Sequence, residues 1–145
     1  MVRDKYFVKR WKGERAKVYK ELIIGIIIII VIASLDYVAQ EYTRNATDDI
    51  IEKLKILQEQ ITSNTSKEDK RNTIDEAYSK WEEFHDISAI FIEHDELEKV
   101  EIDIVSCRNF IEQEVCDMAS NELEKVIFGL EHIEDKYAFS LINVF

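Results

Sequence analysis

The feature that most constrains this chain is an uncharged apolar run from Leu22 to Leu35. Its fourteen residues are LIIGIIIIIVIASL, and eleven of them are Leu, Ile or Val. In water, a run of β-branched residues favours strands and aggregation. In lipid, every backbone polar group must be satisfied within the segment, so the same run forms a helix. Eleven such side chains favour insertion by about 3–7 kcal/mol, and the run therefore predicts a transmembrane helix over residues 21–40.

A cleaved signal peptide is the alternative, because its apolar core has a similar length. Residues 31–33, Val-Ile-Ala, offer a weak cleavage site. The long segment before the run and the lack of a turn-forming residue after it favour an uncleaved anchor. No Cys directly follows the run, which argues against a lipoprotein.

The distribution of basic residues predicts the orientation of this span. Residues 1–20 carry eight Lys and Arg, whereas the twenty residues after the run carry three. Basic segments stay on the cytoplasmic side of a membrane. We therefore expect residues 1–20 to be a basic cytoplasmic tail and residues 41–145 to be an extracytoplasmic domain of a single-pass protein of the cytoplasmic membrane.

The part of the chain after the run is strongly acidic. Of the 30 Asp and Glu, three precede Asp36 and 27 lie from Asp36 onward; of the 19 Lys and Arg, eight lie before this residue and 11 after it, which gives this part of the chain a formal charge of −16. Nucleic acid requires a basic face, so we expect none as a partner. An acidic helical surface is commonly just solvated, although it is also compatible with a basic partner.

The remaining composition predicts an all-α fold. The chain has no Pro and only three Gly, and it is rich in helix formers. Apolar residues recur at spacings of three and four, which predicts helices over about 36–61 and 66–93 and two more after breaks near 94–95 and 112–117. Such stripes bury one another in a small antiparallel bundle of three to four helices. The predicted stripes contain Ile50, Leu54, Leu57 and Ile61, then Ile74, Tyr78, Trp81, Phe84, Ser88 and Phe91, then Leu97, Val100, Ile104, Cys107 and Ile111, then Ala119, Leu123, Val126, Leu130 and Ile133.

Two capping boxes and two cysteines refine this expectation. Thr65 with Glu68, in a loop predicted over 62–69, has capping-box spacing, as does Asp95 with Glu98. Cys107 and Cys116 would lie about 13 Å apart on one helix, too far for a disulfide. A disulfide would need a sharp turn between them, and two free, mostly buried thiols are the simpler prediction.

A series of short motifs runs from Trp81 to the end of the chain. After the Trp come FIEHDELE at 91–98, LEHI at 130–133 and SLINVF at 140–145. Together with the apolar run, this pattern resembles the family called domain of unknown function 4363, small single-span proteins of Gram-positive bacteria. The resemblance covers most of the chain and implies a membrane-anchored helical protein without an assigned activity. Because members are often encoded near a polytopic membrane protein, it also implies such a protein as a partner.

The motifs supply the candidate site residues, which are Trp81, His94, Glu96, His132 and Asn143. They are expected to carry a functional or structural role. The family pattern that begins at the first of these histidines usually ends in Asp, where this chain has Glu98.

The histidines suggest two further possibilities. Glu82-x-x-His85 has the spacing used by di-metal bundles, but the second copy that such a site needs is missing. We therefore expect no metal and no cofactor. His94 and His132 would approach each other if their helices are antiparallel, which would make a pH-sensitive or cation-binding pair. Alternatively, each imidazole bonds a nearby carbonyl or carboxylate and only fixes the bundle.

These observations favour binding over catalysis. No Ser or Cys lies in a Gly-flanked turn and no Gly-rich phosphate loop occurs, so we expect no enzyme. We expect an interaction module that docks on another membrane protein through its apolar tail, residues 135–145, or through an exposed stripe. The alternative is an extracytoplasmic module that senses a ligand or cation through His85, His94, His132 and nearby carboxylates.

Overall fold

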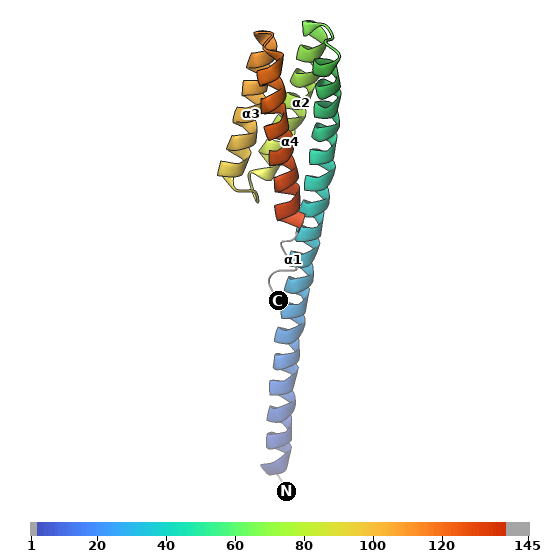
Figure 1. Ribbon diagram of the computed structural model, residues 1–145. Coiled ribbons are helices and arrows are strands. Elements are labelled where there is room, and N and C mark those ends of the chain that lie inside the picture. Colours follow the sequence, from blue (N-terminus) through green and yellow to red (C-terminus); the bar gives the residue numbers. More distant parts are fainter. Residues whose placement is uncertain (1–2, 139–145) are drawn as a thin grey trace. The chain divides into compact units, whose positions relative to one another are not determined.

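The computed structural model of the chain consists of helices and short connections (Figure 1), and it describes residues 3–138. The helices are α1 (Arg3–Thr62), α2 (Lys67–Ser88), α3 (His94–Glu112) and α4 (Cys116–Ala138). No strand occurs within residues 3–138. The predicted all-α class is therefore confirmed.

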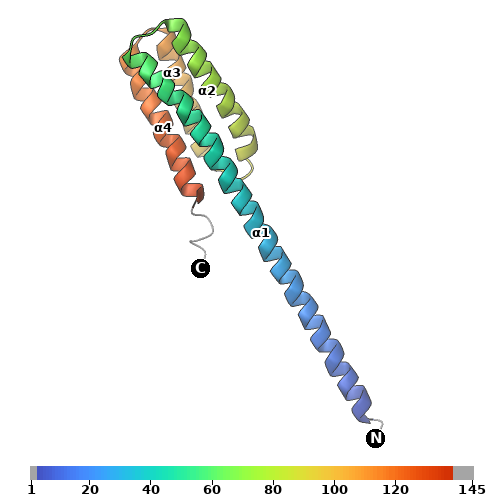
Figure 2. The same ribbon diagram turned by 90° about the vertical axis from the view of Figure 1, so that its right-hand side faces the viewer.

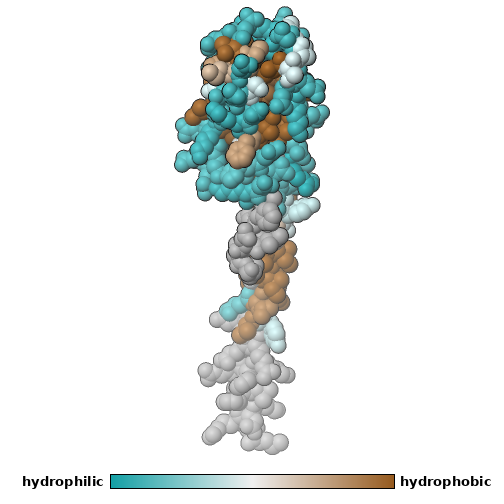
Figure 3. All heavy atoms as spheres, in the orientation of Figure 1, coloured by the Kyte–Doolittle hydropathy of each residue, from teal (hydrophilic) through white to brown (hydrophobic). Residues whose placement is uncertain are grey.

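The chain divides into two compact units, Met1–Val38 and Ala39–Phe145. In the first unit, the side chains of the apolar run are exposed; those of Ile29 and Leu35 are each 66% exposed. Figure 3 shows this run in brown. Among the described residues, one helix is long and apolar enough to cross a membrane, and it lies near the N-terminus.

The second unit is an antiparallel bundle of four helices, because the C-terminal part of α1 packs with α2, α3 and α4 (Figures 1 and 2). Ion pairs join the side chains of neighbouring helices. Lys53 of α1 lies 2.7 Å from Glu76 of α2, and nearer the chain's start Asp49 lies 3.0 Å from Lys80. Since one partner's number falls as the other's rises, the two helices run in opposite directions.

The core of the bundle follows the apolar stripes of the sequence. Every predicted stripe residue of α3 and α4 is buried, whereas Ile61, Tyr78 and Phe91 are only half-buried. Burying a Leu or Ile side chain stabilises the fold by about 1.5–3 kcal/mol. Mutual coverage of the stripes therefore explains why four amphipathic helices assemble.

The connection between α2 and α3 differs from the prediction. Helix α2 ends at Ser88 rather than at residue 93, and in the turn that follows the Ser88 carbonyl accepts hydrogen bonds from the N–H groups of Phe91 and Ile92. Helix α3 begins at His94 with Glu93 as its N-cap, and no side chain caps it. The expected capping box of Asp95 was therefore wrong.

The other two connections are short turns. The N-cap of α2 is Ser66, whose Oγ accepts a hydrogen bond from the N–H of Asp69, so the expectation of Thr65 was wrong by one position. Asn64 and Glu114, each the second residue after the end of α1 or α3, adopt positive φ angles of 53° and 61°, as helix C-terminal turns often require. The break predicted at 112–117 is confirmed.

Both cysteines are free. Cys107 is buried in α3, while Cys116 begins α4 and is partly exposed. The turn that follows Glu112 separates them, so they lie on different helices.

Candidate functional site

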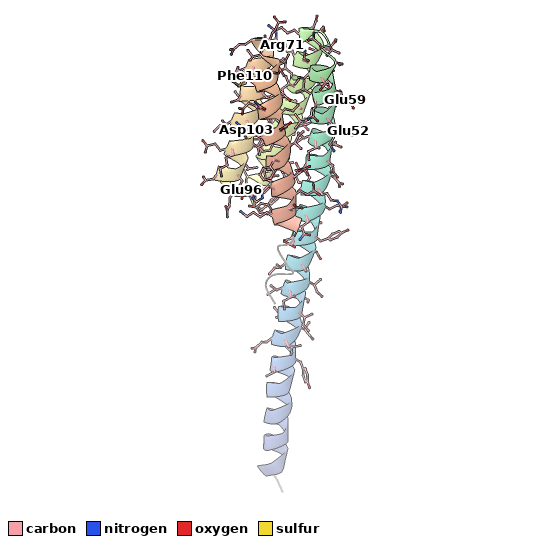
Figure 4. All side chains as sticks on the ribbon, viewed as in Figure 1. Glu52, Glu59, Arg71, Glu96, Asp103 and Phe110 are labelled. Atoms are coloured by element: carbon pink, nitrogen blue, oxygen red, sulfur yellow. The ribbon has the colours of Figure 1, made fainter. Side chains whose placement is uncertain are left out.

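The candidate site is an open groove between α3 and α4, with a volume of about 1010 Å³. This volume is at the upper end of the range for ligand pockets, which is about 300–1,000 Å³. Figure 4 shows Glu96 and Asp103 spaced along α3, the helix that forms one wall. The apolar lining comes from Val100, Met118, Phe128, Gly129 and Ile133.

Gly129 explains the close approach of the two helices. A Cβ atom on this residue would lie 2.8 Å from Cγ2 of Val100 in α3, closer than carbon atoms can pack. Its neighbour Phe128 is 71% exposed and stacks on the ring of His132, with ring centroids 6.4 Å apart. The groove thus has a floor where the helices touch and an aromatic ring at its edge.

Carboxylates dominate the charged rim of the groove. Burial raises the pKa of Asp103, and the neighbouring charge of Glu122 raises it further. Glu122 in turn lies 2.8 Å from Lys125 on its own helix. The rim therefore contains acidic groups that an added cation would stabilise in their charged form.

Glu96 ties the end of the groove to the last turns of α4. Its Oε1 lies 2.6 Å from Nζ of Lys136 and 3.9 Å from Nε2 of His132. The hydrogen bond to Glu96 is the main cause that raises the pKa of Lys136. The side chain of Glu96 is only 15% exposed, and its Oε2 has no hydrogen-bond partner among the described residues.

Trp81 lies in the core rather than in the groove. It is 1% exposed and packs against Phe84, with ring centroids 5.7 Å apart, and against His85 at 6.0 Å. Within the described part of the chain, its Nε1 has no acceptor. Trp81 is thus a packing residue.

The histidines do not gather at one place. His94 is exposed at the first residue of α3, and among the described residues no hydrogen bond or ion pair joins it to His132. His132 meets Glu96 instead, and His85 lies 3.8 Å from Asp86. The structure thus gives His132 a carboxylate neighbour rather than a bond to His94. Asn143 lies outside the described residues.

No metal centre is apparent among residues 18–137: no three His, Cys, Asp or Glu side chains there come together in a way that could hold an ion. Within the part of the chain that the structure describes, no further His, Cys, Asp or Glu joins Glu82 and His85 of α2 in such a group.

Sequence reasoning missed Phe128, Gly129 and Lys136. For Gly129 and Phe128, the sequence did contain a signal. An isolated Gly inside a helical pattern often marks a close backbone approach, and Phe128 lies off the apolar stripe that contains Val126 and Leu130. For Lys136 no local signal existed, because its partner is distant in sequence.

The comparison with known protein families identifies a match to the part of the chain that contains this bundle. The profile described as Domain of unknown function (DUF4363) matches residues 37–144. The chain belongs to this family. No curated protein matches the chain, and no solved structure does. The resemblance inferred from the motifs is thus confirmed, and the DUF4363 match contains α2, α3, α4 and the C-terminal part of α1.

Proposed function

We propose that this DUF4363 protein is a membrane-anchored interaction module, in which the bundle docks on a polytopic membrane protein through the groove between α3 and α4. The proposed function is binding rather than catalysis. The observation that carries it is Phe128, a fully apolar ring that is 71% exposed beside that groove. Exposed aromatic residues at the rim of an apolar depression are typical of binding hot spots.

The apolar run supports the anchor. Its isoleucines are about half exposed or more on every side of α1, an arrangement that is unfavourable in water and favourable in hydrocarbon. With eight Lys and Arg in residues 1–20, the N-terminus is on the cytoplasmic side and the bundle is outside. Such an anchor confines the bundle to partners at the same membrane.

The charge of the groove defines the partner's chemistry. Its rim has four carboxylates against two lysines, and these residues are Glu96, Asp103, Glu122, Glu124, Lys99 and Lys125. Charged groups across an interface are arranged to be complementary. The partner segment therefore has an apolar anchor residue for the groove floor and basic residues at its edges.

Site-specific photocrosslinking in the native host's membranes tests this proposal. A photoreactive residue is placed at position 128 in the full chain, and as a matched control at position 56, where Ile56 is 40% exposed on α1. We expect position 128 to give one discrete adduct with a multi-span protein, and Met118→Glu to abolish this adduct. Position 56 is expected to give none.

Three outcomes would overturn the proposal. They are equal adducts from both positions, an adduct of position 128 with a second copy of this chain, and an adduct with a water-soluble protein. Protease mapping of the adduct checks the partner segment: a segment without Lys or Arg would contradict the charge argument.

A further inference from the structure

The sulfur of Cys116 faces a buried lysine. Cys116 is the first residue of α4 and is partly exposed. Lys70, in the first turns of α2, is only 7% exposed, and its Nζ lies 3.7 Å from Sγ of Cys116. The two residues come from different helices, so the fold itself creates this contact.

Lys70 lacks the carboxylate that a buried ammonium group normally has. Among the residues that the structure describes, its Nζ forms no ion pair. The carboxylate of Glu112 forms ion pairs with two other cations instead, Lys67 at 3.1 Å and Arg71 at 3.0 Å. The sulfur of Cys116 is thus the described group that faces the positive charge of Lys70.

The start of α4 reinforces this effect. The N-terminus of a helix carries a partial positive charge of about half an elementary charge. Cysteines at helix N-termini beside Lys or Arg are therefore the reactive ones, because the thiolate is the nucleophile. Partial exposure gives a reagent access to the sulfur.

Cys107 provides the contrast within the same chain. It is fully buried, and its sulfur lies 3.4 Å from the carbonyl oxygen of Ala119. Burial, with a smaller contribution from the charge of Glu122, raises the pKa of the Cys107 thiol to about 12. This thiol stays protonated and inaccessible.

We infer that Cys116, activated by Lys70, is a modification site for thiol–disulfide exchange with low-molecular-weight disulfides. The Cys116 thiolate attacks one sulfur of the disulfide, a new Sγ–S bond forms, and the old S–S bond breaks. The other sulfur leaves with the electron pair as a thiolate and takes a proton from solvent. Cys116 is oxidised to a mixed disulfide, and one sulfur of the reagent is reduced.

The test uses the full chain in detergent micelles with cystine, the disulfide of cysteine, as the probe. Rates of mixed-disulfide formation are measured by mass spectrometry of the intact protein, and peptide mapping identifies the modified residue. Variants are Lys70→Met, which keeps the length of the side chain without its charge, Lys70→Arg, and Lys67→Met as the matched control on the same turn of α2.

We expect one cystine-derived adduct per chain, at Cys116. The attacking species in this exchange is the thiolate, and the Lys70 ammonium lies 3.7 Å from the sulfur on which its negative charge develops. Lys70→Met is therefore expected to slow the reaction about threefold to tenfold. Lys70→Arg and Lys67→Met are expected to stay within about twofold of the original rate.

Modification of Cys107 ahead of Cys116 in the unsubstituted chain would overturn the inference, whatever the variants do. So would an unchanged rate in a Lys70→Met variant whose circular dichroism matches that of the parent. If Lys70→Met unfolds, two other measurements still test the inference. They are which of the two cysteines of the parent is modified and the rate of mixed-disulfide formation in Lys70→Arg. None of these outcomes depends on docking through the groove.

Discussion

The Nζ of Lys136 in α4 lies 2.6 Å from Oε1 of Glu96 in α3, and it also lies 3.2 Å from Oε2 of Glu93. Directly beside this contact, the N–H of Glu93 donates a hydrogen bond to the hydroxyl oxygen of Tyr137. Consecutive residues of the last turn of α4 thus hold both the start of α3 and the connection before it. Of these residues, Glu96 lines the groove.

Replacement of Lys136 by Met is expected to lower the free energy of unfolding. The hydrogen bond to Glu96 raises the pKa of Lys136, so its stabilising contribution is fully present below the unfolded pKa of about 10.4 and is lost as the pH rises through the higher folded value. The free energy of unfolding of the parent and of Lys136→Met is measured by urea denaturation in detergent. The difference between the two is expected to be constant from about pH 6 to 9, below the ordinary pKa of a lysine side chain, and to shrink above about pH 10.

Lys99→Met is the matched control for this experiment. Lys99 is exposed on α3 beside the groove, and its replacement is expected to change the unfolding free energy by less than about 0.5 kcal/mol. A difference for Lys136→Met that stays unchanged above pH 11, roughly half a unit higher than the ordinary pKa of a lysine side chain, would argue that packing, not the ion pair, is what the substitution removes.

Trp81→Phe is expected to be mild for a core substitution. The change leaves a cavity, but it also removes an indole N–H that has no acceptor among the described residues, and such a buried donor costs about 1–3 kcal/mol. We expect a net change within about 1.5 kcal/mol, against about 3–5 kcal/mol for Trp81→Ala. Equal losses for both variants in urea denaturation would show that the indole nitrogen is bonded in the folded protein.

Gly129→Ala is expected to destabilise the bundle, although Ala is the better helix former by about 1 kcal/mol. The added Cβ would meet Cγ2 of Val100 at 2.8 Å, and such overpacking costs about 1–3 kcal/mol. A net loss of about 1 kcal/mol follows from these two effects. Combining it with Val100→Ala removes the clash, so the two losses in unfolding free energy should sum to more than the loss of the double variant.

Periodicity was sufficient to predict the interior of the bundle. The stripe from Leu97 to Ile111 and the stripe from Ala119 to Ile133 are buried at every predicted position, because burial of an apolar face is a local requirement of each amphipathic helix. The helix ends were harder. Ser66 and Thr65 are chemically equivalent as caps, and only the backbone turn at Asn64 decides between them.

The candidate site depended on contacts that no local pattern encodes. Glu96 was expected from its motif, but its partners His132 and Lys136 come from another helix, and their meeting follows from the register between α3 and α4. Lys70 is a stronger case. A lysine in the first turns of a polar helix predicts a solvated side chain, yet Lys70 is buried, and its Nζ contacts Cys116 at the start of α4.

The last prediction separates stability from binding at Phe128. This ring is 71% exposed, whereas Phe84 in α2 is 1% exposed in the core. Phe128→Ala is therefore expected to change the free energy of unfolding by no more than about 0.5 kcal/mol, while Phe84→Ala costs about 3–5 kcal/mol.

For the binding measurement, the photoreactive residue is placed at position 118, so that Phe128 itself can be replaced. If Phe128 anchors a partner, Phe128→Ala should reduce the yield of the adduct with the membrane protein about tenfold or more, as loss of a hot-spot ring does. Ile87→Ala, at a half-exposed position on α2, serves as the control for both measurements. A large loss of stability with Phe128→Ala would instead make this ring part of the fold, and equal recovery with both variants would remove it from the docking surface.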